Sequence, residues 1–282
     1  MHTTCSDGRL SPAALVAEVR AAGITAFSIT DHDTVAALAE ARALAGRDGL
    51  EFVGGIEVTA VRGGEDVHVL GYGFDEASPR LLEFLRAQRA DRIVRVRAMG
   101  RRLEELGVPV DVETVIAGAG RHRSRSVGRP ALADALVRAG HAASRDEAFE
   151  RWLGRDRPAY LPRRGPAPDE VVRVLAEAGA IAAIAHPGLL AYDGDLADLR
   201  RDGLAAIEVY HPAHTAAQRE RYGALAAALG LLRTGGSDYH GEDPGRPRSL
   251  GCSSLPRAHY EHLIAEGRRR GCARLPHRLA HA

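Results

Sequence analysis

The amino-acid sequence predicts an α/β fold, most simply a closed or nearly closed barrel of strands surrounded by helices. Two stretches of the chain alternate between short apolar strands and amphipathic helices, the order that produces parallel strands with helices packed outside. Polar side chains gather directly after the strands, where such barrels carry their chemistry. The alternation is interrupted between about residues 79 and 157, where the pattern is helical. We therefore expect a barrel with one helical insertion.

The N-terminal stretch supplies the first predicted strands and helices. Residues 11–22, "SPAALVAEVRAA", carry a serine cap and a proline at the first helical position, and the pattern stops at Gly23. "ITAFSIT" is a predicted buried strand that ends at "DHDT", and the following helix closes on Gly46. "LEFVGGIEVTAV" and "DVHVLGYGF" predict two more strands, the second alternating around His68.

The C-terminal stretch repeats this rhythm. "PDEVVRVLAEAG", "DLADLRRDG" and "TAAQRERYGALAAALG" have the periodicity of helices. The segments "AIAAIAH", "LAAIEVYH" and "LLRTGGSDYH" are the strands between and after them, and each ends on a histidine.

The insertion, residues 79–157, is predicted to be all-helical and to form a lid. One face of its first helix is apolar at Ile93, Val96, Met99, Leu103 and Leu106. Residues 86–129 contain eleven arginines against five acids, a local charge of +6 in a chain whose formal net charge is +1. This surplus has two interpretations: the arginines bind an anionic substrate, or they form the solvated face of a long helix.

Composition excludes several classes of protein. Lysine and arginine (38) nearly balance aspartate and glutamate (37), so no whole-surface field attracts nucleic acid or membrane. Three cysteines without CxxC spacing argue against a disulfide framework or a cysteine zinc site. No apolar run approaches the roughly 20 residues that span a bilayer. We expect a cytoplasmic enzyme with no membrane partner and no obligate protein partner.

Metal-ligating side chains stand at or near the predicted strand ends. Each is an imidazole or a carboxylate, the ligand types suited to zinc, manganese or iron. Burying them all without metal would leave several polar groups unpaired. The set is His2, Asp7, His32, Glu57, His68, His186, Asp238 and His240.

Eight ligands exceed the needs of one four- to six-coordinate ion, so their number suggests two or three divalent ions. Ions about 4 Å apart can activate a bridging water and clamp the oxygens of an in-line phosphoryl displacement. This favours phosphoester hydrolysis. Amide or ring hydrolysis is the competing chemistry, and a basic lid favours the anionic substrate.

The motifs resemble those of the PHP (polymerase and histidinol phosphatase) superfamily. The likeness rests on "HTTCSDGRLSPAALV", "ITDHDT", "VHVLGYGFD", "IAHPG" and "GGSDYHG". More narrowly, "GRPALADALV", "RPAYLPRRGPAPDEVV" and "IEVYHPAHT" are similar to the branch with a helical lid, which includes AMP and nucleoside 3',5'-bisphosphate phosphatases and 5'-3' exoribonucleases. The resemblance implies a distorted seven-stranded (β/α)7 TIM-like barrel formed by residues 1–78 and 158–282, with residues 79–157 as the lid.

The resemblance also implies roles for individual residues. The eight residues named above become metal ligands, with His32, Asp238 and His240 at the catalytic centre and a metal-bridging hydroxide as nucleophile. Arg129 in "GRP" corresponds to a lid arginine that holds substrate phosphate. His211 and His214 lie beyond a strand end, in a role that is either substrate-contacting or structural. The implied substrates are small phosphorylated nucleotides or short RNA or DNA oligonucleotides.

Two positions depart from the family pattern. A histidine usually follows the "GRP" arginine shortly, where this chain has Ala131. The family motif at the first strand is histidine, any residue, histidine, and only the second is present, as His2. A truncated N-terminus that lacks the first strand and weakens one metal is one expectation from this. The alternatives are a metal-binding domain that does not catalyse, and a histidinol-phosphate phosphatase, against which the helical lid argues.

Overall fold

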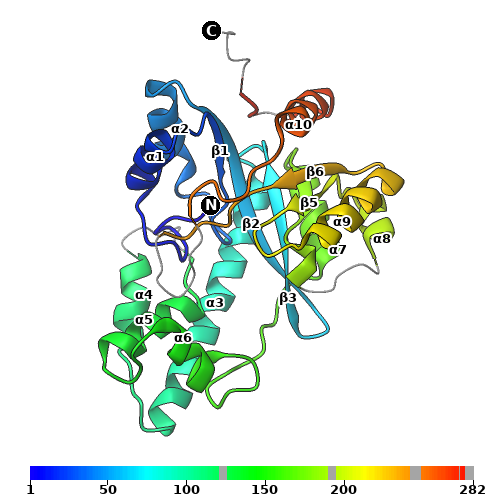
Figure 1. The fold of residues 1–282 in the computed structure, drawn as a ribbon. Helices are drawn as coiled ribbons and strands as arrows, with labels where there is room; N and C mark the ends of the chain where they lie inside the picture. The colour runs from blue at the N-terminus through cyan, green and yellow to red at the C-terminus, as the bar shows by residue number, and fades with distance from the viewer. Residues whose placement is uncertain (121–125, 190–194, 242–248, 273, 277–282) are drawn as a thin grey trace.

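Six strands form one mixed, curled sheet in the computed structural model, and helices cover its outer side (Figure 1). The structure describes residues 1–120, 126–189, 195–241, 249–272 and 274–276. The strands follow one another in chain order across the sheet. They are β1 (Ala26–Ile29), β2 (Glu51–Arg62), β3 (Glu65–Tyr72), β4 (Ile181–Ile184), β5 (Ala206–Tyr210) and β6 (Leu232–Gly235).

The helices confirm most of the periodicity read from the sequence. They are α1 (Pro12–Ala21), α2 (Leu38–Arg47), α3 (Pro79–Glu105), α4 (Val112–Gly120), α5 (Arg129–Arg138), α6 (Arg145–Ala148), α7 (Pro168–Glu177), α8 (Leu196–Arg201), α9 (Ala216–Leu229) and α10 (Arg257–Arg269), with a π-helical turn at Phe149–Leu153 and a 3-10 turn at Pro187–Leu189. Within the described ranges, none of them combines the length and the apolar composition that a membrane span requires.

Local capping explains where helices α1 and α9 begin. The Ser11 hydroxyl accepts a hydrogen bond from the Ala14 N–H at the start of α1, as its sequence predicts. Thr215 and Gln218 form a capping box at the start of α9, which ends at Gly230 in the left-handed conformation. These helices therefore have their ends fixed by the sequence itself.

The sheet is not the all-parallel barrel expected from the alternation. β3 runs antiparallel to both β2 and β4, whereas the other neighbouring pairs are parallel. The physical reason is the two-residue turn Gly63–Gly64, because parallel neighbours require a crossover of a dozen residues or more. The described residues contain the six strands that the sequence pattern predicts, one fewer than the barrel implied by the family resemblance. β1 and β6 do not pair with each other.

The chain start lies between these two unpaired strands (Figure 1). The Thr30 N–H donates to the Met1 carbonyl at 2.9 Å, and the His2 N–H donates to the Tyr239 carbonyl at 2.8 Å. A cavity of about 440 Å³ adjoins this bridge, and its lining includes residues of both β1 and β6. The first two residues therefore occupy one end of the gap, and the cavity occupies the rest.

The insertion has a hydrophobic core of its own. Val96, Met99 and Leu103 are buried on the predicted face of α3 and pack with residues from α4, α5 and the returning segment, residues 154–167, which leads back to the sheet. Leu106, which was expected on the same face, is exposed. The apolar face of α3 therefore ends one turn earlier than predicted.

Several arginines of the insertion bind other parts of the protein, a role that differs from both interpretations of the local charge given above. Arg95 and Arg102 donate to the carbonyls of Leu161 and Tyr160, on the returning segment. Arg97 forms two hydrogen bonds to Glu113 on α4. Part of the local charge thus holds the insertion together. Arg121, Arg123 and Arg125 lie outside the described residues.

Candidate metal centre

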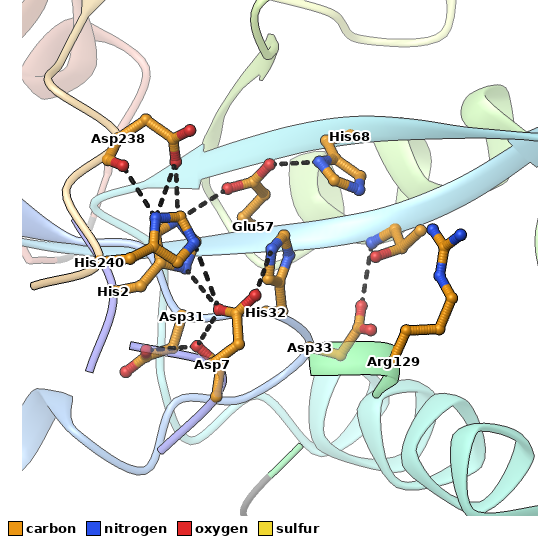
Figure 2. A network of polar contacts seen from close by, with 12 residues as sticks. His2, Asp7, Asp31, His32, Asp33, Glu57, His68, Arg129, Asp238 and His240 are labelled. Atoms are coloured by element: carbon orange, nitrogen blue, oxygen red, sulfur yellow. Dashed lines mark hydrogen bonds and ion pairs between the residues drawn. The ribbon is translucent and has the colours of Figure 1, made fainter. Parts of the chain in front are cut away.

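Side chains from distant parts of the chain meet at one end of the sheet (Figure 2). They form three groups whose ligand atoms lie within 4.8 Å of one another. The groups are His2, Asp7, His32 and His240; His32, Glu57 and His68; and His2, Glu57 and Asp238. Because His2, His32 and Glu57 each belong to two groups, the three groups form one continuous cluster.

Glu57 is the central carboxylate of this cluster. Its Oε2 lies 3.2 Å from His2 Nε2, while its Oε1 lies 2.6 Å from His68 Nδ1 and 3.2 Å from His186 Nε2. The strand register explains the placement, because His68 on β3 pairs with Thr59, two residues after Glu57 on β2. Its contact with Glu57 places His186 beside the cluster, although His186 belongs to none of the three groups.

The remaining ligands surround His2. Asp238 Oδ1 lies 3.2 Å from His2 Nε2, and Asp7 Oδ1 lies 3.6 Å from His2 Nδ1. Asp7 also faces His32 and His240, at 3.8 and 3.4 Å. The His2 and His240 rings stack with centroids 4.1 Å apart. Together with His186, all eight predicted ligands are thus brought together.

Asp31 fixes the loop that carries His2 and Asp7. Its carboxylate accepts hydrogen bonds from the Thr3 N–H, the Thr3 hydroxyl and the Ser6 hydroxyl at 2.6 to 2.7 Å. Gly8 lets the loop fold back tightly, since a Cβ there would lie 2.3 Å from the His2 carbonyl oxygen. The N-terminal ligands are therefore positioned by hydrogen bonds to Asp31 and by the tight turn at Gly8.

Substituting Gly8 with alanine is expected to weaken manganese binding by roughly 10-fold or more, because the added methyl displaces the His2 backbone. Isothermal titration with Mn²⁺ measures the change. Gly46→Ala is the matched control, since a Cβ there meets nothing within 4 Å. Equal manganese affinities in the two variants would show that a methyl group at position 8 does not displace His2.

Three site residues adopt backbone conformations that are rare outside glycine. Asp33, His186 and Asp238 have φ of 52°, 28° and 49°. Such strain costs on the order of 1–3 kcal/mol per residue and clusters at functional sites. Each of these residues follows the end of a strand closely, so the backbone turns sharply there. The turns direct His186 and Asp238 toward the cluster, whereas Asp33 pairs with Arg92 and Arg163.

Electrostatics in the cluster favour ionised carboxylates. Burial disfavours the charge on Glu57, but His32, His68 and the hydrogen-bonded His186 and His2 hold its pKa well below the usual range. Burial also lowers the pKa of His2, yet hydrogen bonds to Asp238 and Glu57 outweigh it and raise that pKa to about 10. Burial dominates at His32 and lowers its pKa to about 4. Without metal, protons therefore occupy part of the site.

The donor set fits divalent metal ions. Buried ring nitrogens without a hydrogen-bond partner among the described residues are His2 Nδ1, His32 Nδ1, His186 Nδ1 and His211 Nε2. An unpaired buried polar atom is costly, so these nitrogens favour a further partner such as a bound ion or water. Imidazole and carboxylate donors together suit zinc, manganese and iron.

The three predicted substrate-binding residues lie in different surroundings. Arg129 is at the opposite end of the network from Asp238, and its Nη2 lies 3.5 Å from Asp66 (Figure 2). His211 is buried, with Nε2 3.6 Å from Asp238 Oδ2. Both ring nitrogens of His214 have backbone partners, the Val209 carbonyl and the Gly188 N–H.

Two features of the site were missed by the sequence analysis. Glu208 is buried beside the cluster and accepts a hydrogen bond from the His186 N–H at 2.7 Å. Burial raises its pKa above the usual value. Arg92 and Arg163, from α3 and the returning segment, both pair with buried Asp33. The acid in the apolar strand "AIEVY" is a signal that could have indicated Glu208.

Imidazoles and carboxylates gathered at one end of a curled α/β sheet are typical of a metal centre in an α/β protein. Comparison with known proteins supplies the family. A protein from Bifidobacterium adolescentis described as a metal-dependent phosphoesterase has the same fold, with a TM-score of 0.86, 33% identity and 94% of each chain covered. No protein-family model matches the chain.

Curated relatives agree with this structural likeness. The chain is 31% identical to a 5'-3' exoribonuclease of Haemophilus influenzae, over 85% of its own length and 88% of the relative. It is 31% identical to a 3',5'-nucleoside bisphosphate phosphatase of Chromobacterium violaceum (88% and 90% covered) and 36% identical to a phosphoribosyl 1,2-cyclic phosphate 1,2-diphosphodiesterase of Eggerthella lenta (86% and 93%). The chain therefore belongs to the PHP superfamily of metal-dependent phosphoesterases and is a hydrolase of phosphoester bonds.

Proposed function

We propose that this enzyme hydrolyses phosphate esters of small nucleotides, such as AMP or nucleoside 3',5'-bisphosphates, or of short 5'-phosphorylated oligonucleotides. The observation that carries the proposal is the continuous cluster of three ligand groups, which offers room for two or three divalent ions. The names of the relatives from Haemophilus influenzae and Chromobacterium violaceum support this substrate class. Cys5, Cys252 and Cys272 form no disulfide within the described part of the chain, which supports a cytoplasmic enzyme.

The geometry supports roles for residues in and beside the cluster. His2, Asp7, His32, Glu57, His68, His186, Asp238 and His240 hold the ions, which when bound supply a water nucleophile and neutralise charge on the substrate. The side chains of His240 and Asp238 are 28% and 22% exposed, so both can contact the substrate. His211 faces the Asp238 carboxylate and holds it in place. His214 holds the backbone at Val209 and Gly188.

The catalytic unit comprises residues 1–78 and 158–282, and residues 79–157 form a helical lid. The separate core of the insertion supports this division. The cavity between β1 and β6 supports a distorted seven-stranded TIM-like barrel, since one further strand would join the two unpaired edges.

Extending the chain before Met1 by six alternating valines and threonines is expected to raise the melting temperature by roughly 5 °C. The added residues would continue the bridge that Met1 and His2 already form and pair with β1 and β6. A glycine-serine extension of equal length is the control. Identical melting curves for the two extended chains would contradict the placement of a strand in this cavity.

The substrate proposal is tested by phosphate or mononucleotide release with added manganese. The panel contains AMP, a nucleoside 3',5'-bisphosphate, a 5'-phosphorylated oligoribonucleotide, a phosphoribosyl cyclic phosphate and histidinol phosphate. Turnover of the nucleotide substrates supports the proposal, whereas preference for histidinol phosphate supports the alternative phosphatase. No turnover of any substrate, with one ion or none found by elemental analysis, would indicate a domain that does not catalyse.

A further inference from the structure

Arg92 is held rigidly beside the metal centre by two buried groups. Its Nε donates to Asp33 Oδ2 at 2.5 Å and its Nη2 donates to the Thr59 hydroxyl at 2.8 Å. The side chain is 13% exposed, and the Asp33 side chain is fully buried. An arginine fixed at two of its nitrogens has lost most of its rotamer freedom before any ligand arrives, which lowers the entropic cost of a further contact.

The third nitrogen of Arg92 faces the site. Nη1 has no hydrogen-bond partner among the described residues and lies 3.0 Å from the position that a Cβ on Gly128 would occupy. Arg92, Asp7, His32 and Gly128 together line a small cavity. The free edge of the guanidinium is therefore directed toward a space that two metal ligands also border.

The groups that pair with Asp33 carry a positive surplus. The single carboxylate of Asp33 pairs with Arg92 and also with Arg163, whose Nη2 lies 3.2 Å away, and Arg89 donates to the Asp33 backbone carbonyl. One buried negative charge thus faces two guanidinium groups. Arg92 and Arg163 share the Asp33 carboxylate as their partner, so the surplus positive charge is available to an anion.

The α5 helix adds to the same positive field. Gly128 is its N-cap, with no side chain to satisfy the first N–H groups, and Gly128, Pro130 and Ala131 all line the cavity. By contrast, the guanidinium of Arg129 lies over the rings of Phe149 and Tyr160 and does not line this cavity.

We propose that Arg92 binds a non-bridging phosphate oxygen of the substrate through Nη1, and that Asp33 and Thr59 are the positioning residues that aim it. This inference rests on the proposed phosphoester hydrolysis and assigns Arg92 as a side chain that contacts the substrate phosphate. His32 and Asp33 are consecutive residues of one sharp turn. That turn therefore positions both a metal ligand and the partner of the phosphate-binding arginine.

The test compares Arg92→Ala and Arg92→Lys with wild type, and uses Arg97→Ala as the matched control, because Arg97 lies on the same helix but pairs with exposed Glu113. Binding of inorganic phosphate to the manganese-loaded protein is measured by isothermal titration, and manganese content by elemental analysis. A lost charge-assisted hydrogen bond corresponds to roughly 10- to 100-fold, so both Arg92 variants are expected to bind phosphate at least about 10-fold more weakly at unchanged manganese content. Lysine is included because its single ammonium cannot both pair with Asp33 and reach the phosphate.

Steady-state kinetics separates this inference from the proposed function. On a substrate that wild type hydrolyses, the Arg92 variants are expected to raise KM or lower kcat/KM by the same factor, with Thr59→Val giving a smaller loss. If wild type hydrolyses nothing, the proposed function fails while the phosphate titration still tests Arg92. Wild-type phosphate affinity in either Arg92 variant that folds would overturn the assignment, as would an equal loss in Arg97→Ala.

Discussion

Glu57→Gln is expected to reduce kcat/KM for phosphoester hydrolysis by at least about 100-fold while the protein remains folded. Glu57 contributes to two of the three ligand groups, so losing its charge affects more than one ion. The glutamine amide nitrogen would also face the His2 or His68 ring in place of an acceptor oxygen. Steady-state kinetics with manganese and elemental analysis of the purified variant measure both effects.

Glu261→Gln is the matched control for this substitution. Glu261 is exposed on α10 and pairs with Arg257 on the same helix, far in sequence from every ligand. Exposed pairs contribute little, so the control is expected to keep wild-type activity and metal content. Wild-type activity with a full metal complement in Glu57→Gln would remove Glu57 from the catalytic centre.

The candidate ligands could be predicted because each is a rare residue type in a simple local context. An imidazole or carboxylate directly after a short apolar segment can be recognised from the sequence alone, as in "ITDHDT" and "IAHPG". Parallel strand order then brings such positions to one edge. His68 was found by its alternation, although it reaches the cluster from an antiparallel strand.

Partners that depend on long-range packing could not be predicted. Nothing in the local sequence of Arg92 or Arg163 indicates that both contact Asp33, since these contacts span 59 and 130 residues of sequence. The arginines of α3 look alike in composition, yet Arg95 fixes the returning segment, Arg97 pairs with α4 and Arg92 faces the site. Charge counting therefore located the basic region but could not assign its functions.

The direction of β3 was predictable in principle. Two consecutive glycines between the apolar segments are a hairpin signal, and a hairpin requires antiparallel strands. The overall α/β alternation predicts a parallel sheet, and the local turn contradicts this global pattern. The local turn prevailed because two residues cannot cross over a sheet.

Manganese is expected to stabilise the protein, and increasingly so as the pH rises from 6.5 to 9. Metal coordination requires neutral imidazoles, but in the metal-free site hydrogen bonds to carboxylates, acting against burial, raise the pKa of His2 to about 10 and that of His186 to about 9. Binding must therefore displace protons, and the affinity falls as the pH is lowered. At a free manganese concentration of 100 times Kd the gain is about 2.7 kcal/mol.

The metal-free protein is expected to show the opposite trend. A histidine whose pKa is higher in the folded state than the unfolded value near 6.5 adds stability that is complete below that value and lost as the pH rises through the folded pKa. Thermal melts in chelator should therefore move to lower temperature between pH 6.5 and 10, whereas melts with manganese should change less. His2→Asn removes one of the two raised groups and should flatten the chelator curve. A metal-free melting temperature that rises across this range would show that the histidines are not protonated partners of Glu57 and Asp238, and that metal does not compete with protons in this cluster.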